Sequence, residues 1–475
     1  MLRMLWLVMG LAGCAPVPPP QPAAPRCASP APAGAPRAPV LTSGPLIAAD
    51  DVRADFEGWL AQMAALHPDL SLRTDLAGFE RTRATIIAAI DRPMTQREAW
   101  LLFARLNPYL RDGHNGIQMP DRAALAQAHL DAGGRVFPFT VHLGSDGLLR
   151  VRDATAGVAR GARILAINGR AADQVIAEML ALTDGDTPAF RRELVARRFV
   201  VLHWLLFGDT RDYAVTLDDG AGCPRQLLVP GATALAPSDQ PKVPASSRFA
   251  YQILAGEVGY LKAASFSGEY GEALAQVARQ AFTEFKARGI RALIIDVRDN
   301  GGGDDPLWQA NLMEYITAKP YAHVGRFAVR INQHNADPGD VIGEVQRKDY
   351  KKRITPSPVQ PLRFDGPVYL LAGPFSYSST IQFLVAAQDF GIARIAGRET
   401  GGLACQTGKV TQIEMPRTGL RAYTPVIAFT RPSGHGCERG VIPELAVDDD
   451  GLDPDRAPAL LARMIESART QRVDR

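Results

Sequence analysis

The hydrophobic period of residues 366–391 changes midway from that of a strand to that of a helix. Val368 to Ala372 form a short apolar run between two Gly-Pro pairs, which is typical of a buried strand. From Ser379 onward apolar residues recur at helical spacing, and Gly391 is expected to end the helix. The hydroxyl residues at 376–380 therefore lie on a strand-to-helix turn, where free backbone N–H groups accompany a rigidly held nucleophile. The alternative is that these hydroxyls only cap the helix.

Two earlier regions have patterns of their own. Residues 47–132 show apolar residues at helical spacing, so we expect a helical N-terminal domain. Residues 137–230 contain short strands around one or two helices, with a tight Asn168-Gly169 turn after one strand. Residues 231–247 are rich in proline and in small or polar residues, which is typical of a linker.

The remaining region, residues 248–475, alternates buried strands with helices. An apolar strand over 292–298 leads into a run of three glycines at 301–303. This alternation predicts an α/β core with a mainly parallel sheet, in which sites lie beyond the carboxyl ends of the strands. Both the glycine run and Ser378 lie at such ends.

The first residues predict export. Arg3 precedes an apolar run that is too short to cross a bilayer, which is typical of a signal peptide over residues 1–14. Its end, Leu-Ala-Gly-Cys, resembles the bacterial lipobox, so Cys14 is expected to carry a lipid; an ordinary signal with an incidental Cys is the alternative. The proline-rich segment 15–46 is expected to be a stiff spacer. We expect a lipid-anchored chain on the periplasmic side of the cell envelope, and Ala15 in place of Asp favours the outer membrane of a Gram-negative host.

The charge balance argues against one class of partner. The 475 residues carry a net charge of only +3, and the chain has no long run of Lys and Arg. Nucleic acid is therefore not an expected partner.

Several separated stretches resemble the C-terminal processing (tail-specific) serine peptidases, whose relatives include the tricorn protease core and the retinoid-binding protein repeats. The matching stretches are Gly256–Leu261 with Ser265-Phe266, Leu293–Gly303, Ser376–Thr380, Gln388–Gly391 and Gly397–Gly402. Asp112-Gly113-His114 resembles the Asp-Gly-His-Thr element of many members, and residues 158–180 resemble a PDZ-domain segment. The resemblance implies a crotonase-like β-β-α superhelix as the catalytic domain, preceded by a helical domain and a PDZ-like domain, with protein or peptide substrates.

The same resemblance implies a nucleophile and an oxyanion hole. With Gln388-Asp389 as the anchor, the nucleophile is Ser378 rather than Ser376 or Ser379. The backbone N–H groups of Ser379 and of Gly301 or Gly302 are then expected to form the oxyanion hole, because a glycine lets the substrate come close.

The expected general base depends on the branch of the family. Many members use a Lys directly after a Gly-x-x-Thr-x-Gly motif, but Leu403 occupies that position here and Lys409 is only a weak substitute. The tricorn-like branch uses a His and a Glu instead, which correspond to His114 and Glu438. Together with Ser378 these residues form the Ser/His/Glu set that acyl transfer requires.

Alternatives to this set remain open. The tricorn core has a Ser before its His where this chain has Gly113, so the carboxylate could contact His114 directly, act through water, or be replaced by Asp112 or Asn115. His435 is the rival base. The rival carboxylate is Glu399, for which we expect a helix-capping role or pairing with Arg298.

The cysteines of an exported chain lie in an oxidising compartment. We favour a Cys405–Cys437 disulfide, since both lie in the catalytic stretch, with Cys27 and Cys223 either joined or free. No spacing resembles a zinc site, and no metal or cofactor is expected.

Three functions fit the sequence. The first is an exported, lipid-anchored serine endopeptidase that forms an acyl-enzyme on Ser378. The second is a catalytically inactive protein that binds an apolar ligand or peptide in the same cleft. The third is a scaffold that recruits partners through its PDZ-like domain.

Overall fold

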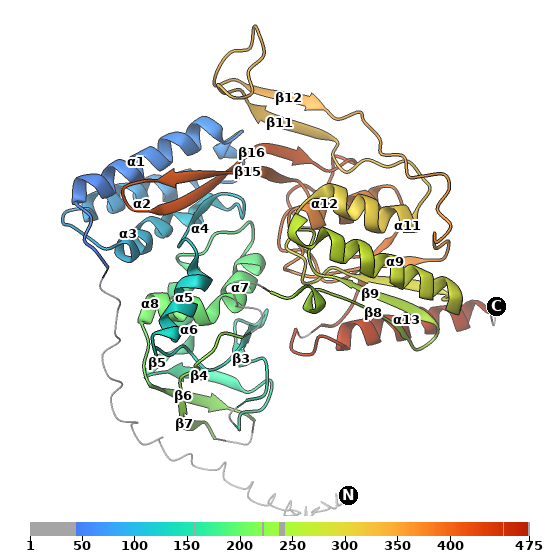
Figure 1. Ribbon diagram of the computed structural model, residues 1–475, viewed down its shortest axis with the longest axis horizontal. Coiled ribbons are helices and arrows are strands. Elements are labelled where there is room, and N and C mark those ends of the chain that lie inside the picture. The colour runs from blue at the N-terminus through green and yellow to red at the C-terminus, as the bar shows by residue number, and fades with distance from the viewer. Residues whose placement is uncertain (1–43, 156, 221–222, 237–242, 450, 474–475) are drawn as a thin grey trace, which may run out of the picture.

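The computed structural model describes residues 44–473 except 156, 221–222, 237–242 and 450, and it has a mixed α/β fold with three sheets (Figure 1). Cys14 and Cys27, with the expected signal peptide and nearly all of the expected spacer, lie outside the described residues. Within the described part, no helix combines the length and the apolar character needed to cross a membrane.

The N-terminal part is mainly helical. Its helices are α1 Ala49–Leu66, α2 Leu76–Ala89, α3 Gln96–Phe103, α4 Asn107–Leu110 and α5 Arg122–Asp131. Helix α3 begins with a capping box, in which the Thr95 hydroxyl accepts from the Glu98 N–H and the Glu98 carboxylate accepts from the Thr95 N–H. The helical pattern did not predict strand β1, Gly116–Gln118, which interrupts these helices.

The middle part is an antiparallel sheet with three helices, where the sequence predicted one or two. The strand order is β2-β3-β4-β6-β7, with β5 paired to β4. The strands are β2 Val141–Leu143, β3 Leu149–Val151, β4 Arg163–Ile167, β5 Arg170–Ala171, β6 Asp212–Asp218 and β7 Arg225–Pro230. The helices are α6 Ala172–Leu180, α7 Pro188–Arg197 and α8 Phe199–Phe207.

The C-terminal part contains the mainly parallel sheet that the sequence predicted, in the order β17-β14-β13-β10-β9-β8. The strands are β8 Phe249–Leu254, β9 Val258–Ala263, β10 Ala292–Asp296, β13 Val368–Ala372, β14 Arg394–Gly397 and β17 Leu445–Ala446, and only the β8–β9 pair is antiparallel. Alternate residues of β10 face opposite sides, because side chains along a strand alternate. Leu293 and Ile295 pack with helices α9 Gly271–Arg288 and α12 Ser379–Asp389, whereas Ala292 and Ile294 pack with α13 Arg456–Val473.

The glycine run after β10 leads into shorter helical turns. These are α10 Asp305–Trp308, a π-helical turn Gln309–Met313 and α11 Glu314–Ile316.

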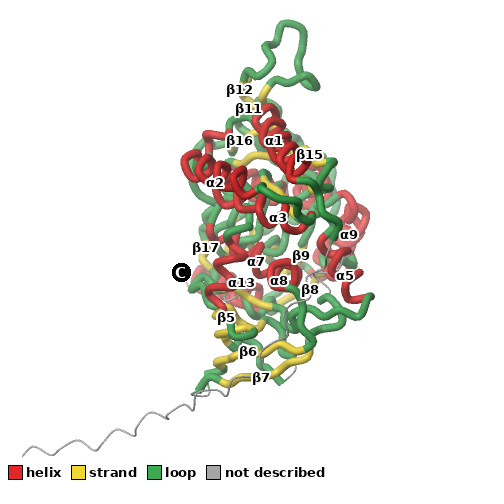
Figure 2. The backbone as a smooth tube through the Cα atoms, turned by 90° about the vertical axis from the view of Figure 1, so that its left-hand side faces the viewer, coloured by secondary structure: helices red, strands yellow, loops and turns green. Residues whose placement is uncertain are grey.

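A third, antiparallel sheet joins the N-terminal helices to the C-terminal part, and the sequence did not predict it. Its order is β1-β16-β11-β12, with β15 also paired to β16. Its other strands are β11 Arg326–Arg330, β12 Val345–Asp349, β15 Gln406–Met415 and β16 Leu420–Thr430. Gly116 of β1 lies opposite Tyr423 of β16, so the loop before β1 is held against the C-terminal part. The β11–β12 hairpin projects beyond the helices in both views (Figures 1 and 2).

Candidate active site

Ser378 stands on a strained turn between β13 and α12. Its backbone angles are φ 55° and ψ −124°, a combination that residues other than glycine rarely adopt. Such strain costs on the order of 1–3 kcal/mol and persists only where the surroundings impose it, most often at functional sites. The turn leaves Ser378 partly exposed while its neighbours Tyr377 and Ser379 are buried.

The two rival serines have their hydroxyls engaged elsewhere. The Ser376 hydroxyl donates to the carbonyl of Val297 at 2.8 Å. The Ser379 hydroxyl donates to Asp305 at 2.5 Å and accepts from the Trp308 indole N–H at 2.9 Å. Of the three, only the Ser378 hydroxyl faces a histidine.

The glycine run lies against this turn. A side chain on Gly302 would come within 2.6 Å of the Ser378 Cβ, and one on Gly303 within 2.0 Å of the Phe266 backbone. The Gly302 N–H donates to the Asn300 side chain at 2.9 Å, while the N–H groups of Ser379 and Gly301 have no acceptor among the described residues. Of the three expected oxyanion donors, Ser379 and Gly301 are therefore unengaged.

His114 is the histidine at the turn, and its Nε2 lies 2.9 Å from the Ser378 Oγ. The residue is only 7% exposed. Its loop begins at Arg111, whose left-handed backbone (φ 49°) ends α4, and the His114 N–H donates to the Asp112 carboxylate at 2.8 Å. Pairing of β1 with β16 fixes the far end of the loop, so both ends position the ring.

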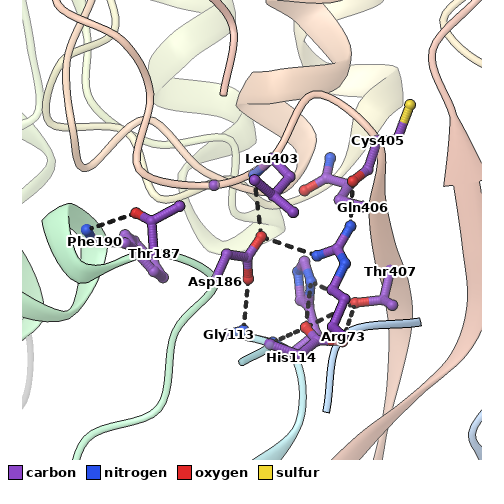
Figure 3. Close-up of polar contacts among 12 residues, drawn as sticks. Arg73, Gly113, His114, Asp186, Thr187, Phe190, Leu403, Cys405, Gln406 and Thr407 are labelled. Carbon is purple, nitrogen blue, oxygen red and sulfur yellow. Dashed lines mark hydrogen bonds and ion pairs between the residues drawn. The ribbon is translucent and has the colours of Figure 1, made fainter. Parts of the chain in front are cut away.

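The other ring nitrogen, Nδ1, faces two hydroxyl groups. The hydroxyls of Thr407 and Tyr377 each lie 3.3 Å from it. Thr407 donates to Asp112 at 2.8 Å, and Tyr377 donates to Asp186 at 2.8 Å (Figure 3 shows the Thr407 and Asp186 side chains near His114). Because each hydroxyl gives its proton to a carboxylate, each presents a lone pair to an Nδ1–H. This arrangement favours the tautomer in which Nε2 accepts the Ser378 proton.

Asp112 is a buried carboxylate that stays ionised. Burial alone would raise its pKa, but the nearby His67 imidazole and the positive charge of Arg73 outweigh burial and lower the pKa. The His67 Nε2 lies 3.7 Å from Asp112.

Asp186 comes from the middle part and connects all three parts of the molecule. It accepts hydrogen bonds from the Gly113 N–H at 2.8 Å, the Leu403 N–H at 3.1 Å and the Arg73 guanidinium at 3.1 Å (Figure 3). Tyr377 completes its set of donors.

The electrostatics of the site keep His114 neutral. Burial lowers the pKa of His114, and the nearby charges of Asp112 and Asp186 only partly oppose that effect. Burial, followed by the same two carboxylates, raises the pKa of Tyr377 well above its ordinary value. A neutral imidazole beside a serine hydroxyl can act as a general base.

Gly113 stands where the tricorn-like pattern has a serine, and the structure gives the reason. A side chain at Gly113 would lie 2.6 Å from the Tyr377 hydroxyl and 2.8 Å from the Phe190 ring. Those two rings stack with their centroids 4.1 Å apart. The Tyr377 hydroxyl therefore occupies the space that a serine side chain would need.

Glu438, the carboxylate that the sequence favoured, is not among the described groups in contact with His114. Glu438 is exposed, and neither it nor any group bonded to it is among the described contacts of His114. The next residue, Arg439, forms a 2.6 Å ion pair with Glu399. The same pair corrects the expected partner of Glu399, since Arg298 instead pairs with Asp296 and Asp449.

The other rivals also lie apart from the serine. His435 and Lys409 are exposed and have no described contact with Ser378. The Cys405–Cys437 disulfide that the sequence favoured is present, with Cα atoms 4.7 Å apart. Among the described residues, no group of three or more His, Cys, Asp or Glu side chains is arranged to hold a metal ion.

Four residues around His114 were missed in the sequence. They are Arg73, Asp186, Tyr377 and Thr407. Tyr377 directly precedes the predicted nucleophile, and this position in the sequence could have indicated it. The other three lie in separate segments, and nothing in their local sequence distinguishes them from surface, cap or strand residues.

Comparisons with known proteins bear on the family and on the fold. Residues 257–447 match the model of Peptidase family S41. The fold is similar to that of mature CPAF complexed with lactacystin, with 14% identity, a TM-score of 0.65 and coverage of 89% of this chain and 98% of that chain. Mature CPAF alone gives 16% identity, a TM-score of 0.63 and coverage of 89% and 97%.

A third structure, the photosystem II D1 C-terminal processing protease, is 17% identical over 90% of this chain and 98% of that chain. Its TM-score is 0.45. No curated protein matches the sequence. The family match supports a serine-type peptidase, and the solved structures support the fold.

Proposed function

We propose that this chain is an exported serine endopeptidase of the tail-specific type, which hydrolyses peptide bonds through an acyl-enzyme on Ser378. The observation that carries the proposal is the 2.9 Å contact between the His114 Nε2 and the Oγ of a backbone-strained serine. The match of residues 257–447 to a peptidase family supports the same chemistry.

In the proposed reaction, His114 takes the Ser378 proton as the oxygen attacks the scissile carbonyl carbon. The N–H groups of Ser379 and Gly301 stabilise the resulting oxyanion, and Gly302 permits the close approach. The imidazolium then protonates the leaving amine, and water, activated by the same ring, releases the acyl group. Asp112 and Asp186 stabilise the positive ring through the Thr407 and Tyr377 hydroxyls, a role that the sequence assigned to Glu438.

The test is a Ser378→Ala substitution in the full chain, assayed with a fluorogenic peptide library and with casein. We expect kcat/KM to fall by about 10⁴-fold or more, since loss of a triad nucleophile leaves only residual catalysis. Ser376→Ala is the matched control and should keep its activity if it folds, as checked by its melting temperature. Equal cleavage by the Ser378→Ala chain and the wild type would refute the assignment.

A serine-directed fluorophosphonate distinguishes this proposal from an inactive binding protein. The wild type should be labelled at Ser378, and the Ser378→Ala chain should not. Absence of labelling together with absence of cleavage favours the binding protein.

We also propose that residues 137–230 form a PDZ-like domain and that residues 248–475 form a crotonase-like catalytic domain. The antiparallel five-stranded path with α6 supports the first assignment, and the β-strand and helix order around the parallel sheet supports the second. Export and lipid attachment at Cys14 rest on the sequence. A Cys14→Ala chain should move from the membrane fraction to the soluble fraction.

A further inference from the structure

A charged cavity lies between the middle part and the C-terminal part, on the edge of the parallel sheet that carries Ser378. Its walls include residues that follow strands β10, β13, β14 and β17, together with residues of β2 and α7. Crevices at the carboxyl ends of parallel strands are common ligand sites. Gly373, Pro374 and Phe375 line the cavity and lead directly into the strained turn.

Each of the four acidic side chains that line the cavity has a cationic partner, and that of Asp453 is Arg160, 3.9 Å away. Asp299 pairs with Arg197 at 2.6 Å, and Asp449 pairs with Arg298 at 2.7 Å. Glu193 lies 3.5 Å from the same Arg197, whose guanidinium also covers the Phe375 ring. In these ion pairs, which hold the side chains of the cavity wall in place, each charge is neutralised by that of its partner.

Two arginines of the cavity are different. Arg152 and Arg398 are half-buried, and neither side chain has a hydrogen bond or ion pair with another described residue. His142, which is 9% exposed, lines the same cavity. Burial lowers the pKa of His142; the charge of Glu193 opposes this effect, and the charges of Arg152 and Arg398 add to it. The cavity therefore holds positive charge that no protein group neutralises by direct contact.

We propose that this cavity binds a carboxylate of a peptide substrate, with Arg152 and Arg398 as the guanidinium donors. Arginine suits planar carboxylates because its N–H groups form a matching fork. The nearby Glu193, Asp299 and Asp449 disfavour a doubly charged anion, so a single negative charge fits better than phosphate. The assignment to a substrate rests on the proposed peptidase function, since the cavity wall continues into the Ser378 turn.

The test measures binding without turnover. The full chain with Ser378→Ala is titrated with three fluorescent peptides of one apolar sequence, and anisotropy gives each Kd. The first peptide has a free carboxyl end, the second is amidated, and the third is amidated with one internal Glu. Tighter binding of the first identifies a chain end, and tighter binding of the third identifies an acidic side chain.

We expect at least one acidic peptide to bind about tenfold or more tightly than the neutral peptide, because charge-assisted hydrogen bonds to a carboxylate supply such a factor. Arg152→Gln and Arg398→Gln should each reduce that preference about tenfold, whereas Arg81→Gln, at an exposed helical site, should keep it. Equal binding of all three peptides, or an unchanged preference in both arginine variants, would overturn the proposal. Because the Ser378→Ala chain cannot cleave the peptides, this test measures binding alone. Failure of the carboxylate proposal can therefore be distinguished from failure of the proposed peptidase function.

A second measurement needs no arginine variant. The groups around the ring of His142 are Arg150 within β3, Arg152 after β3, Glu193 of α7, Arg398 after β14 and the loop with Asp449, Gly451 and Asp453. A bound carboxylate adds negative charge there, so acetate should raise the pKa of His142, measured by NMR, relative to chloride at equal ionic strength. No rise at saturating acetate would contradict the proposal.

Discussion

The two sides of the His114 ring are built in different ways. On the Nε2 side, one continuous segment supplies the nucleophile, its strain and the first turn of helix α12. On the Nδ1 side, four segments from three parts of the molecule meet, and they supply Asp112, Asp186, Tyr377 and Thr407. The first side has one reacting group and no substitute, whereas the second has two parallel routes from a hydroxyl to a carboxylate. Loss of a group should therefore be close to complete on one side and graded on the other.

The largest graded loss is expected for Asp186→Asn. This change weakens the Tyr377 route and leaves Arg73, which is only 16% exposed, without its carboxylate. We expect kcat/KM to fall about 10²- to 10³-fold, below the loss known for a sole orienting carboxylate. The free energy of unfolding should fall by about 3 kcal/mol, since breaking a buried ion pair leaves a charge unpaired.

Kinetics and urea unfolding measure these two effects. Asp146→Asn, which breaks an exposed pair with Arg150, is the matched control and should change both quantities little. Wild-type kcat/KM in a folded Asp186→Asn chain would show that Asp186 does not act on the ring.

The other route is broken by Thr407→Val. The substitution keeps the shape of the side chain but removes the hydroxyl between Asp112 and the Nδ1 of His114. We expect kcat/KM to fall about tenfold, with KM nearly constant, because one oriented hydrogen bond is lost. Thr407→Ser should restore most of the rate, and Thr411→Val on the exposed side of the same strand should have no effect. A rate that follows side-chain volume instead of the hydroxyl would contradict this role.

The dependence of kcat/KM on pH tests how burial and the nearby carboxylates set the pKa of His114. Burial lowers the pKa of His114, so the ring stays neutral and active below the ordinary histidine value of about 6.5. The acid limb of kcat/KM should therefore lie below about pH 6.5. Asp112 raises the pKa of His114, so Asp112→Asn should move the limb to still lower pH as the rate falls. A limb above pH 6.5, or an upward shift in the variant, would be inconsistent with this electrostatic account.

The smallest effect is expected for Glu438→Gln. The side chain is exposed and has no described contact with His114, so kcat/KM should change less than about twofold. Steady-state kinetics on an uncharged peptide measure it, with Glu399→Gln as a comparison that removes the Arg439 pair. A loss of tenfold or more would return Glu438 to the role that the sequence gave it.

The difference between the two sides also explains what the sequence could predict. The Ser378 turn is encoded by neighbours, since an apolar run, a hydroxyl cluster and a helical period follow one another in the chain. The structure has β13 and α12 where those patterns predicted them. The mainly parallel sheet was predictable for the same reason, because each buried strand carries its own apolar run.

The surroundings of His114 were less predictable because they depend on strand pairing across the chain. Thr407 reaches the ring only because β15 and β1 both pair with β16, and β1 is too short to show a strand pattern. Asp186 precedes an ordinary helix start, in which Thr187 caps α7. Glu438 was chosen from a motif, and a motif does not report which side chains surround His114 in the folded chain.

The separation of the reacting groups along the chain determines when the site can assemble during synthesis. The imidazole and the hydroxyl lie 264 positions apart, and strand β16, which holds the histidine loop, comes later still. Domains fold as they leave the ribosome, from the N-terminus onward, and pairings this distant form slowly. A nascent chain therefore cannot assemble the Ser378–His114 pair until most of its length has been made. The topology of the fold thus sets the point in synthesis at which proteolytic activity can begin.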